Sequence, residues 1–139
     1  MTNFPEKYLV SACLVGLCTR YDGMCKPDNH CLQELKGKCW IPVCPEQLGG
    51  LATPRAPANL VGGDGHEVLA GRAAVIDANG RDVSAEFVRG AEQVLAIARA
   101  QNITLALLKS RSPSCGLGQP TGVTTALLLT NGLNCQTFG

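Results

Sequence analysis

Three cysteines of this chain each follow, within a few residues, an apolar run typical of a buried β-strand. Small polar residues, Gly or Pro surround each of them. Because parallel strands of an α/β sheet end at one edge, where ligands bind, we expect the three thiols to meet there. Three ligands could hold one metal centre and leave a position for a substrate, as catalytic sites do. The runs and their cysteines are Lys7–Val10 with Cys13, Trp40–Val43 with Cys44, and Ala106–Leu108 with Cys115.

The other five cysteines lack this shared context. Cys31 falls on an expected helix and Cys39 at an expected strand start, where a buried cysteine behaves as a small hydrophobic residue. Cys18 and Cys25 lie near Cys13 in the sequence, and a local zinc site of these three is an open alternative. Cys-x-x-Cys pairs and ferredoxin spacings are absent from the sequence, which removes the strongest zinc-ribbon, thioredoxin and ferredoxin signals. The fifth of these cysteines is Cys135.

The composition predicts one globular domain over residues 1–139. Hydrophobic residues make up 45% and charged residues 17%, which suits a packed core and argues against disorder. A net charge of +1 and 4% aromatic residues provide no basis for binding nucleic acid or a membrane surface. The N-terminus has no secretory signal pattern, and no apolar stretch is long enough to span a bilayer. We therefore expect a cytoplasmic protein whose thiols serve as metal ligands or catalytic groups rather than disulfides.

Strand and helix patterns alternate along the chain, which predicts an α/β sheet with right-handed crossovers. Asp28 or Asn29 is the expected N-cap of the first helix, and Ser84 that of the strongest one. Pro42 removes a ladder donor, so its strand should be irregular or near a sheet edge. The expected strands are 7–12, 39–43, 103–108 and 133–138, and the expected helices are 29–35, 85–101 and 121–129.

The middle of the chain is expected to be less regular. Residues Cys44–Asp64 are rich in Gly and Pro and predict a long functional or mobile loop. Val68–Leu69 and Ala73–Asp77 predict a small hairpin that turns near Gly71. His30 and His66 are expected to lie at the surface.

Four ordered motifs resemble a family of small bacterial proteins, formerly of unknown function, that includes the thiouracil desulfidases. The resemblance spans nearly the whole chain. It implies a single Rossmann-like α/β domain with a small, mostly parallel sheet flanked by helices. The motifs are Ser11–Leu14, Arg20–Gly23, Val43–Leu51 with Thr53–Arg55, and Lys109–Gly116.

The resemblance also implies a cofactor and a reaction. The cofactor is a [4Fe-4S] cluster held by Cys13, Cys44 and Cys115, with one iron free to bind the sulfur of the substrate. The expected substrates are small thiolated pyrimidines, such as thiolated uracil or 4-thiouridine monophosphate. Water would replace the sulfur, which leaves as sulfide, and no net redox change is required.

Roles for individual residues follow from this reaction. Glu46, two residues after a ligand, is the expected general base, and Ser112 would relay or donate a proton. The glycines of the Gly49–Gly50 loop are expected to line the substrate cavity, because they allow close backbone approach. The candidate contacts for a substrate phosphate are Arg20, Arg55, Lys109 and Arg111.

Two other classes of protein remain open at this point. One is a zinc-binding structural or interaction module, with zinc on Cys13, Cys18, Cys25 or Cys44. The other is a cluster-bearing redox or sulfur-carrier protein without hydrolytic activity. The colour of protein purified without oxygen and the release of sulfide from thiolated pyrimidines distinguish these classes from a desulfidase.

Overall fold

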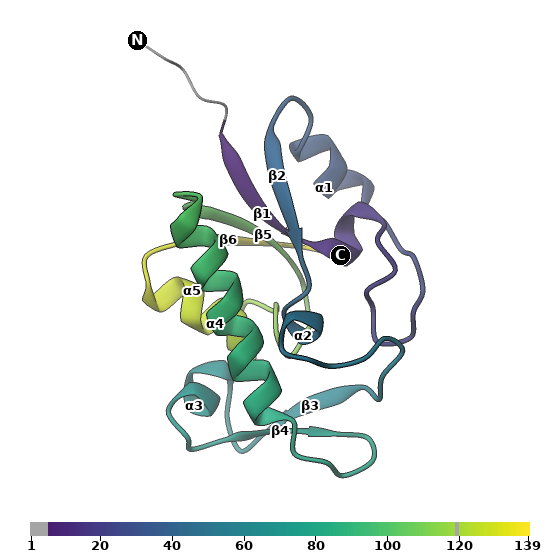
Figure 1. The fold of residues 1–139 in the computed structure, drawn as a ribbon, viewed down its shortest axis with the longest axis vertical. Helices are drawn as coiled ribbons and strands as arrows, with labels where there is room; N and C mark the ends of the chain where they lie inside the picture. Colours follow the sequence, from purple (N-terminus) through teal and green to yellow (C-terminus); the bar gives the residue numbers. More distant parts are fainter. Residues whose placement is uncertain (1–5, 119) are drawn as a thin grey trace.

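The structure, a computed structural model, describes residues 6–118 and 120–139 (Figure 1). It has the predicted alternation of strands and helices. The elements in chain order are β1 Lys7–Ser11, the 3-10 turn η1 Ala12–Val15, α1 Asn29–Glu34, β2 Cys39–Val43, α2 Pro45–Leu48, β3 Ala58–Val61, α3 Gly65–Leu69, β4 Ala74–Asp77, α4 Ser84–Ala100, β5 Leu105–Lys109, α5 Val123–Thr130 and β6 Asn134–Phe138.

The main sheet is parallel, in the strand order β2-β1-β5-β6. This confirms the predicted fold class and all four predicted strands of this sheet. Pro42 lies on the edge strand β2, as predicted, where proline is tolerated in a sheet. Ser11 at the end of β1 pairs with Val43 at the end of β2, so these two strands end level with each other.

Both faces of the two central strands, β1 and β5, are buried, as is typical of a parallel sheet. Successive side chains of a strand point to opposite faces, so adjacent residues of β1 enter different clusters. Leu9 packs with Ala106, Leu108 and the apolar side of α4 and α5. Tyr8 and Val10 pack on the other face with Leu14 of η1, Cys31 of α1 and Leu35, which follows α1.

A second, two-stranded sheet differs from the hairpin predicted from the sequence. The antiparallel partner of β4 is β3, and Val68 and Leu69 belong to the short helix α3. Asp64 starts that helix by accepting a hydrogen bond from the amide of Glu67. An apolar pair is too short to distinguish strand from helix by periodicity. The prediction of a long loop over Cys44–Asp64 was also wrong, because this segment contains α2 and β3.

The two predicted helix caps have different outcomes. Asp28 caps α1, and its Oδ1 accepts a hydrogen bond of 2.9 Å from the amide of Cys31. Ser84 was predicted to cap α4, but Val83 occupies that position. The Ser84 hydroxyl instead accepts a 2.8 Å hydrogen bond from the amide of Val75 in β4. A tertiary contact to the small sheet has therefore replaced the local cap.

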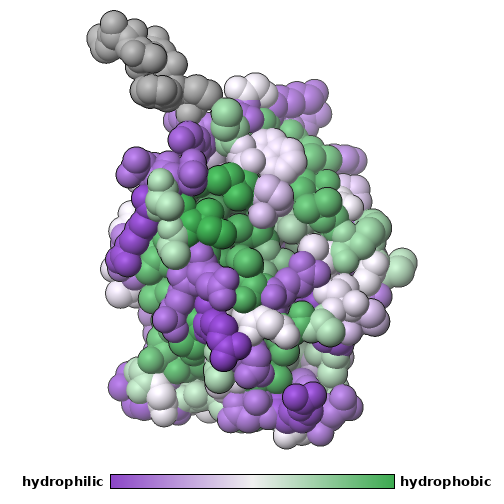
Figure 2. Space-filling model, in the orientation of Figure 1, coloured by the Kyte–Doolittle hydropathy of each residue, from purple (hydrophilic) through white to green (hydrophobic). Residues whose placement is uncertain are grey.

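The surface carries exposed apolar side chains on the loop between η1 and α1. Leu17, Tyr21 and Met24 are all exposed there. This loop forms the right-hand edge of the molecule in the shared orientation of Figures 1 and 2, and pale green and white residues mark that edge in Figure 2. Among residues 6–118 and 120–139, no helix has the length and apolar character needed to cross a membrane.

A close contact between two glycines fixes the position of α2 against the long helix α4. A β-carbon on Gly90 would clash with the carbonyl oxygen of Pro45, and one on Gly49 with that of Glu86. The backbones of the two helices therefore touch, and α2 follows the position of α4.

Replacing Gly90 with alanine tests this contact. Alanine favours a helix over glycine by about 1 kcal/mol, so an uncrowded site would gain stability. At this position we expect a loss of about 1–3 kcal/mol in the free energy of unfolding, because backbone atoms have to move apart. Urea denaturation measures the change. Higher stability of Gly90→Ala would contradict the packing.

Candidate functional site

The ends of three adjacent parallel strands bring the predicted cysteines to one edge of the sheet. Cys13 lies in η1, directly after β1. Cys44 follows β2 as the N-cap residue of α2. Cys115 lies in the loop between β5 and α5. The loops that follow β1, β2 and β5 start side by side because these strands are neighbours in the sheet.

The three thiols line one cavity of about 350 Å³. Burial raises the pKa of the Cys13 thiol, and proximity to Cys44 raises it further. Burial also raises the pKa of Cys115 to about 12, and Cys44 and Cys13 add to this effect. Hydrogen bonds from Ser11 and Ser114 oppose the shift. Because each deprotonated sulfur would repel the others, a cationic centre bound among these thiols would favour their ionised forms.

No group of three or more His, Cys, Asp or Glu side chains in the described ranges is arranged to hold a single metal ion. The three thiols line one cavity. Sulfur donors are the ligands that soft metal centres such as iron–sulfur clusters prefer.

Glu46 enters the same cavity from the first turn of α2. Its Oε1 accepts a 2.9 Å hydrogen bond from Nε of Arg55, and its Oε2 accepts one of 3.1 Å from the Ser114 hydroxyl. The Oγ atom of Ser112 lies 3.0 Å from the Oγ atom of Ser114. The structure thus brings both predicted proton-transfer residues together and joins them through Ser114.

Arg55 differs from the phosphate contact expected from the sequence. Each nitrogen of its guanidinium group already has a partner within the protein. Nη2 donates to the carbonyl oxygen of Thr19 at 2.9 Å and approaches Sγ of Cys44 at 3.8 Å. Nη1 donates to Thr53 Oγ1 at 2.7 Å and to the carbonyl of Ala52 at 3.4 Å. The guanidinium group is used to hold Glu46 and the cavity wall.

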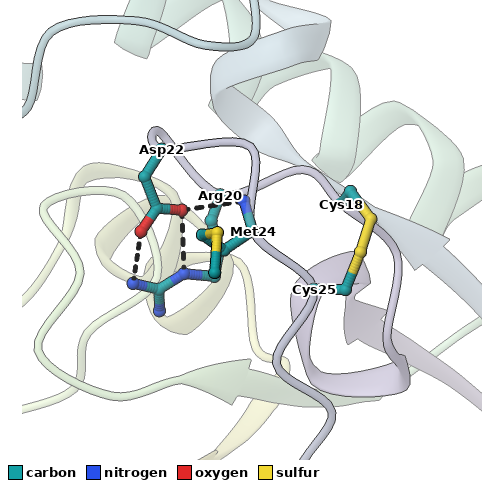
Figure 3. Close-up of a disulfide and its surroundings, with 5 residues drawn as sticks. All are labelled: Cys18, Arg20, Asp22, Met24 and Cys25. Carbon is teal, nitrogen blue, oxygen red and sulfur yellow. Dashed lines mark hydrogen bonds and ion pairs between the residues drawn. A yellow bond between two sulfur atoms is a disulfide. The ribbon is translucent and has the colours of Figure 1, made fainter.

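The other three predicted cationic side chains line the cavity. Arg20 forms a two-bond ion pair with Asp22, and that hydrogen bonding raises its pKa (Figure 3). Lys109 Nζ and Arg111 Nη2 each donate to the carbonyl oxygen of Gly139, at 3.0 and 3.2 Å. These contacts engage only part of each cationic group, which leaves donors for an anion.

Gly49 and Gly50, predicted to line the substrate cavity, do not do so. Gly49 packs against α4, as described above. Gly50 has a φ of 100°, which glycine adopts without strain, and so turns the chain after α2. Their lack of side chains serves helix packing and a turn rather than approach to a ligand.

Cys18 and Cys25 form a disulfide, which contradicts both the expectation of reduced thiols and the alternative of a zinc site with Cys13. The intervening segment folds back, and the two Cα atoms lie 4.5 Å apart. Figure 3 shows the bond beside the Arg20–Asp22 pair of the same loop. Oxidised sulfurs cannot serve as thiolate ligands. The sequence contains the two cysteines, but their approach depends on the turn between them.

Sequence reasoning missed Ser114, which contacts Glu46, Ser112 and the sulfur of Cys115. It also missed Ser11, whose hydroxyl accepts from the amide of Lys109 and interacts with Cys115. Both residues stand next to or near a predicted ligand in the sequence. Adjacency is a weak signal, because it does not tell which way a side chain points.

The site is thus a cavity at the strand ends of an α/β domain, with three thiols and a carboxylate on its wall. Residues 8–137 match the model of the family described as 2-thiouracil desulfurase, and the chain belongs to that family. A solved structure described as the [4Fe-4S]-dependent thiouracil desulfidase TudS superposes with a TM-score of 0.80. Its sequence is 41% identical, over 95% of this chain and 90% of that one.

A second relative is the uncharacterised protein YbbK of Bacillus subtilis. It is 42% identical over 110 residues, which cover 79% of this chain and 73% of YbbK.

The ion pair at the site predicts a measurable contribution to stability. The side chains of Arg55 and Glu46 are 9% and 15% exposed, so Arg55→Ala leaves a mostly buried carboxylate without its partner. We expect a loss of about 3 kcal/mol in the free energy of unfolding of the cluster-free protein. Arg72→Ala is the matched control, because it breaks the Arg72–Glu67 pair, whose side chains are 66% and 39% exposed. Equal losses in urea denaturation of the two variants would contradict this account.

Proposed function

We propose that this protein is a desulfidase that replaces the sulfur of a thiolated uracil, or of 4-thiouridine monophosphate, with oxygen from water. The observation that carries the proposal is the shared cavity of three thiols, Glu46 and Ser112. Support also comes from the family and from the 41% identity to TudS, a [4Fe-4S]-dependent thiouracil desulfidase.

Cys13, Cys44 and Cys115 would hold a [4Fe-4S] cluster. The donor set fits this group: all three are sulfur ligands, they surround a cavity, and two of them have raised pKa values that a cationic centre would reverse. When bound, the cluster would supply a sulfur-binding Lewis acid for the C=S bond.

The other residues of the cavity have separate roles in this proposal. Glu46 accepts a proton from the attacking water, and Arg55 holds the carboxylate in place for this step. Ser112 supplies a proton to the substrate. Arg20, Lys109 and Arg111 contribute donors toward a phosphate group, which would favour a nucleotide over the free base.

The alternatives are less well supported. In the zinc-module hypothesis, Cys18 or Cys25 would have to bind metal, and these two form a disulfide. A cluster-bearing redox or sulfur-carrier protein would need no carboxylate and serine beside the thiols. Turnover distinguishes that class from a desulfidase.

The function is tested with protein purified and reconstituted without oxygen. We expect brown protein that contains iron and inorganic sulfide in equal amounts, and that releases sulfide from 4-thiouracil or 4-thiouridine monophosphate. Serine in place of Cys13, Cys44 or Cys115 should remove both the iron and the activity, while Cys39→Ser, at an exposed thiol, should remove neither. Colourless protein with one zinc ion would support the zinc module instead.

Two further variants test the proton-transfer residues. Glu46→Gln and Ser112→Ala should retain iron and colour but release sulfide at least about 10²-fold more slowly. Glu67→Gln is the control, because Glu67 is a carboxylate paired to an arginine on the surface. Loss of iron in Glu46→Gln would make that residue structural, and wild-type rates in both variants would refute their proposed roles.

A further inference from the structure

Tyr21 is the aromatic residue on the wall of the cavity. Among residues 6–118 and 120–139, those that line the cavity include no other aromatic side chain. Tyr8 and Phe87 are buried in the core, and Trp40 lies on the edge strand β2. Apart from the cysteines, the other apolar residues of the wall are Ala, Val or Pro. A planar ligand that enters the cavity therefore has Tyr21 as its aromatic partner.

Tyr21 is also accessible to such a ligand. It is 43% exposed, so the protein leaves much of its surface uncovered. The guanidinium carbon of Arg20 lies over the ring, 5.8 Å from its centroid, which is within range of a cation–π contact. Leu17 and Met24 are exposed on the same loop, but they do not line the cavity. Of these three exposed residues, Tyr21 is the one placed at the site.

The backbone at Tyr21 is held independently of its side chain. The carbonyl oxygen of Tyr21 accepts a 2.8 Å hydrogen bond from the amide of Arg55. The disulfide between Cys18 and Cys25 closes the loop on both sides of Tyr21, as Figure 3 shows for the loop as a whole. A substitution that changes only the side chain of Tyr21 leaves these two constraints in place.

Arg55 links the position of Tyr21 to that of the carboxylate. Its backbone amide binds Tyr21, and its side chain donates from Nε to Glu46 Oε1 at 2.9 Å. A substrate ring that rests on Tyr21 is therefore positioned relative to Glu46 as well. This arrangement suits a flat substrate whose reacting carbon has to lie beside the carboxylate.

We propose that Tyr21 is a substrate-binding residue that stacks on the pyrimidine ring, an inference that rests on the proposed function. The edges of a thiolated uracil carry its polar groups, whereas its faces are π surfaces that an aromatic side chain covers favourably. The free base and the nucleotide present the same face, so both should use this contact. Stacking holds the substrate and the transition state alike, so Tyr21 contributes to KM and not to kcat.

The experiment compares Tyr21→Ala and Tyr21→Phe with the wild type, all cluster-loaded. We expect Tyr21→Ala to raise KM roughly fivefold or more for both 4-thiouracil and 4-thiouridine monophosphate, with kcat and iron content unchanged. Tyr21→Phe keeps the ring and should keep the wild-type KM. Trp40→Ala is the matched control, because Trp40 is 39% exposed and does not line the cavity; it should change neither constant.

A second measurement uses binding instead of turnover. Calorimetric titration compares uridine monophosphate, the oxo product, with ribose 5-phosphate, which has the phosphate but no base. Tyr21→Ala should weaken binding of uridine monophosphate roughly fivefold or more and leave that of ribose 5-phosphate unchanged. This pair of ligands separates loss of the stacking surface from a displaced loop, because a displaced loop would also move Arg20 and weaken phosphate binding.

The outcomes separate the stacking contact from the proposed function. If the loaded wild type releases no sulfide from thiolated pyrimidines, the proposed function fails. If the wild type is active and Tyr21→Ala has the same KM, the stacking contact is wrong. An equal rise of KM in Tyr21→Phe would also overturn it, because the hydroxyl and not the ring would then be the contact. Equal weakening of both titrated ligands would overturn it as well, because Tyr21 would then act through the fold of its loop.

Discussion

Parallel pairing of β1 with β2 and with β5 is the constraint on which the site depends. These three strands are neighbours, and the chain leaves each of them at the same edge of the sheet. Thiols separated by up to 102 positions in the sequence (Cys13 to Cys115) therefore reach one cavity. A shift of one residue in either pairing would move every side chain of a strand to the opposite face of the sheet. The two faces pack against different clusters of side chains, so packing on both faces stabilises the register.

The cavity is lined by ionisable side chains, whose charged forms cost free energy when they are buried without a partner. Desolvation disfavours the charged forms of Cys13 and Cys115, and nearby sulfurs add to this cost. The opposite charge comes from Arg55, which binds Glu46 and approaches Cys44. A metal centre held by the thiols would add more positive charge. Fixed positive charge also comes from Lys109 and Arg20, which act to lower the pKa of Cys13.

The second layer of the fold determines where the carboxylate lies. Glu46 is carried by α2, a helix of four residues that is too short to be stable by itself. The contact between Gly49 and Gly90 anchors it to α4, the longest helix. The hydroxyl of Ser84 then joins the start of α4 to the small sheet. The position of this carboxylate thus depends on packing well outside the cavity.

Apolar periodicity and turn residues in the sequence determined the main sheet, α4 and α5, because these elements follow from local pattern and from burial on both faces. The positions of Cys13, Cys44 and Cys115 at the strand ends could also be predicted from the sequence, since residues just after parallel strands share one edge of the sheet. The Asp28 cap could be predicted because its hydrogen bond spans three residues.

Tertiary structure decided what depends on contacts distant in the sequence. The partners of Arg55, the link from Glu46 to Ser114, and the meeting of Gly49 with Gly90 each join separate segments. The Ser84 hydroxyl likewise accepts a hydrogen bond from β4 and does not cap its own helix. Local pattern shows which residues are capable of such contacts. Only the folded chain selects the partner, because the free energy of each hydrogen bond and close approach depends on groups that packing brings together.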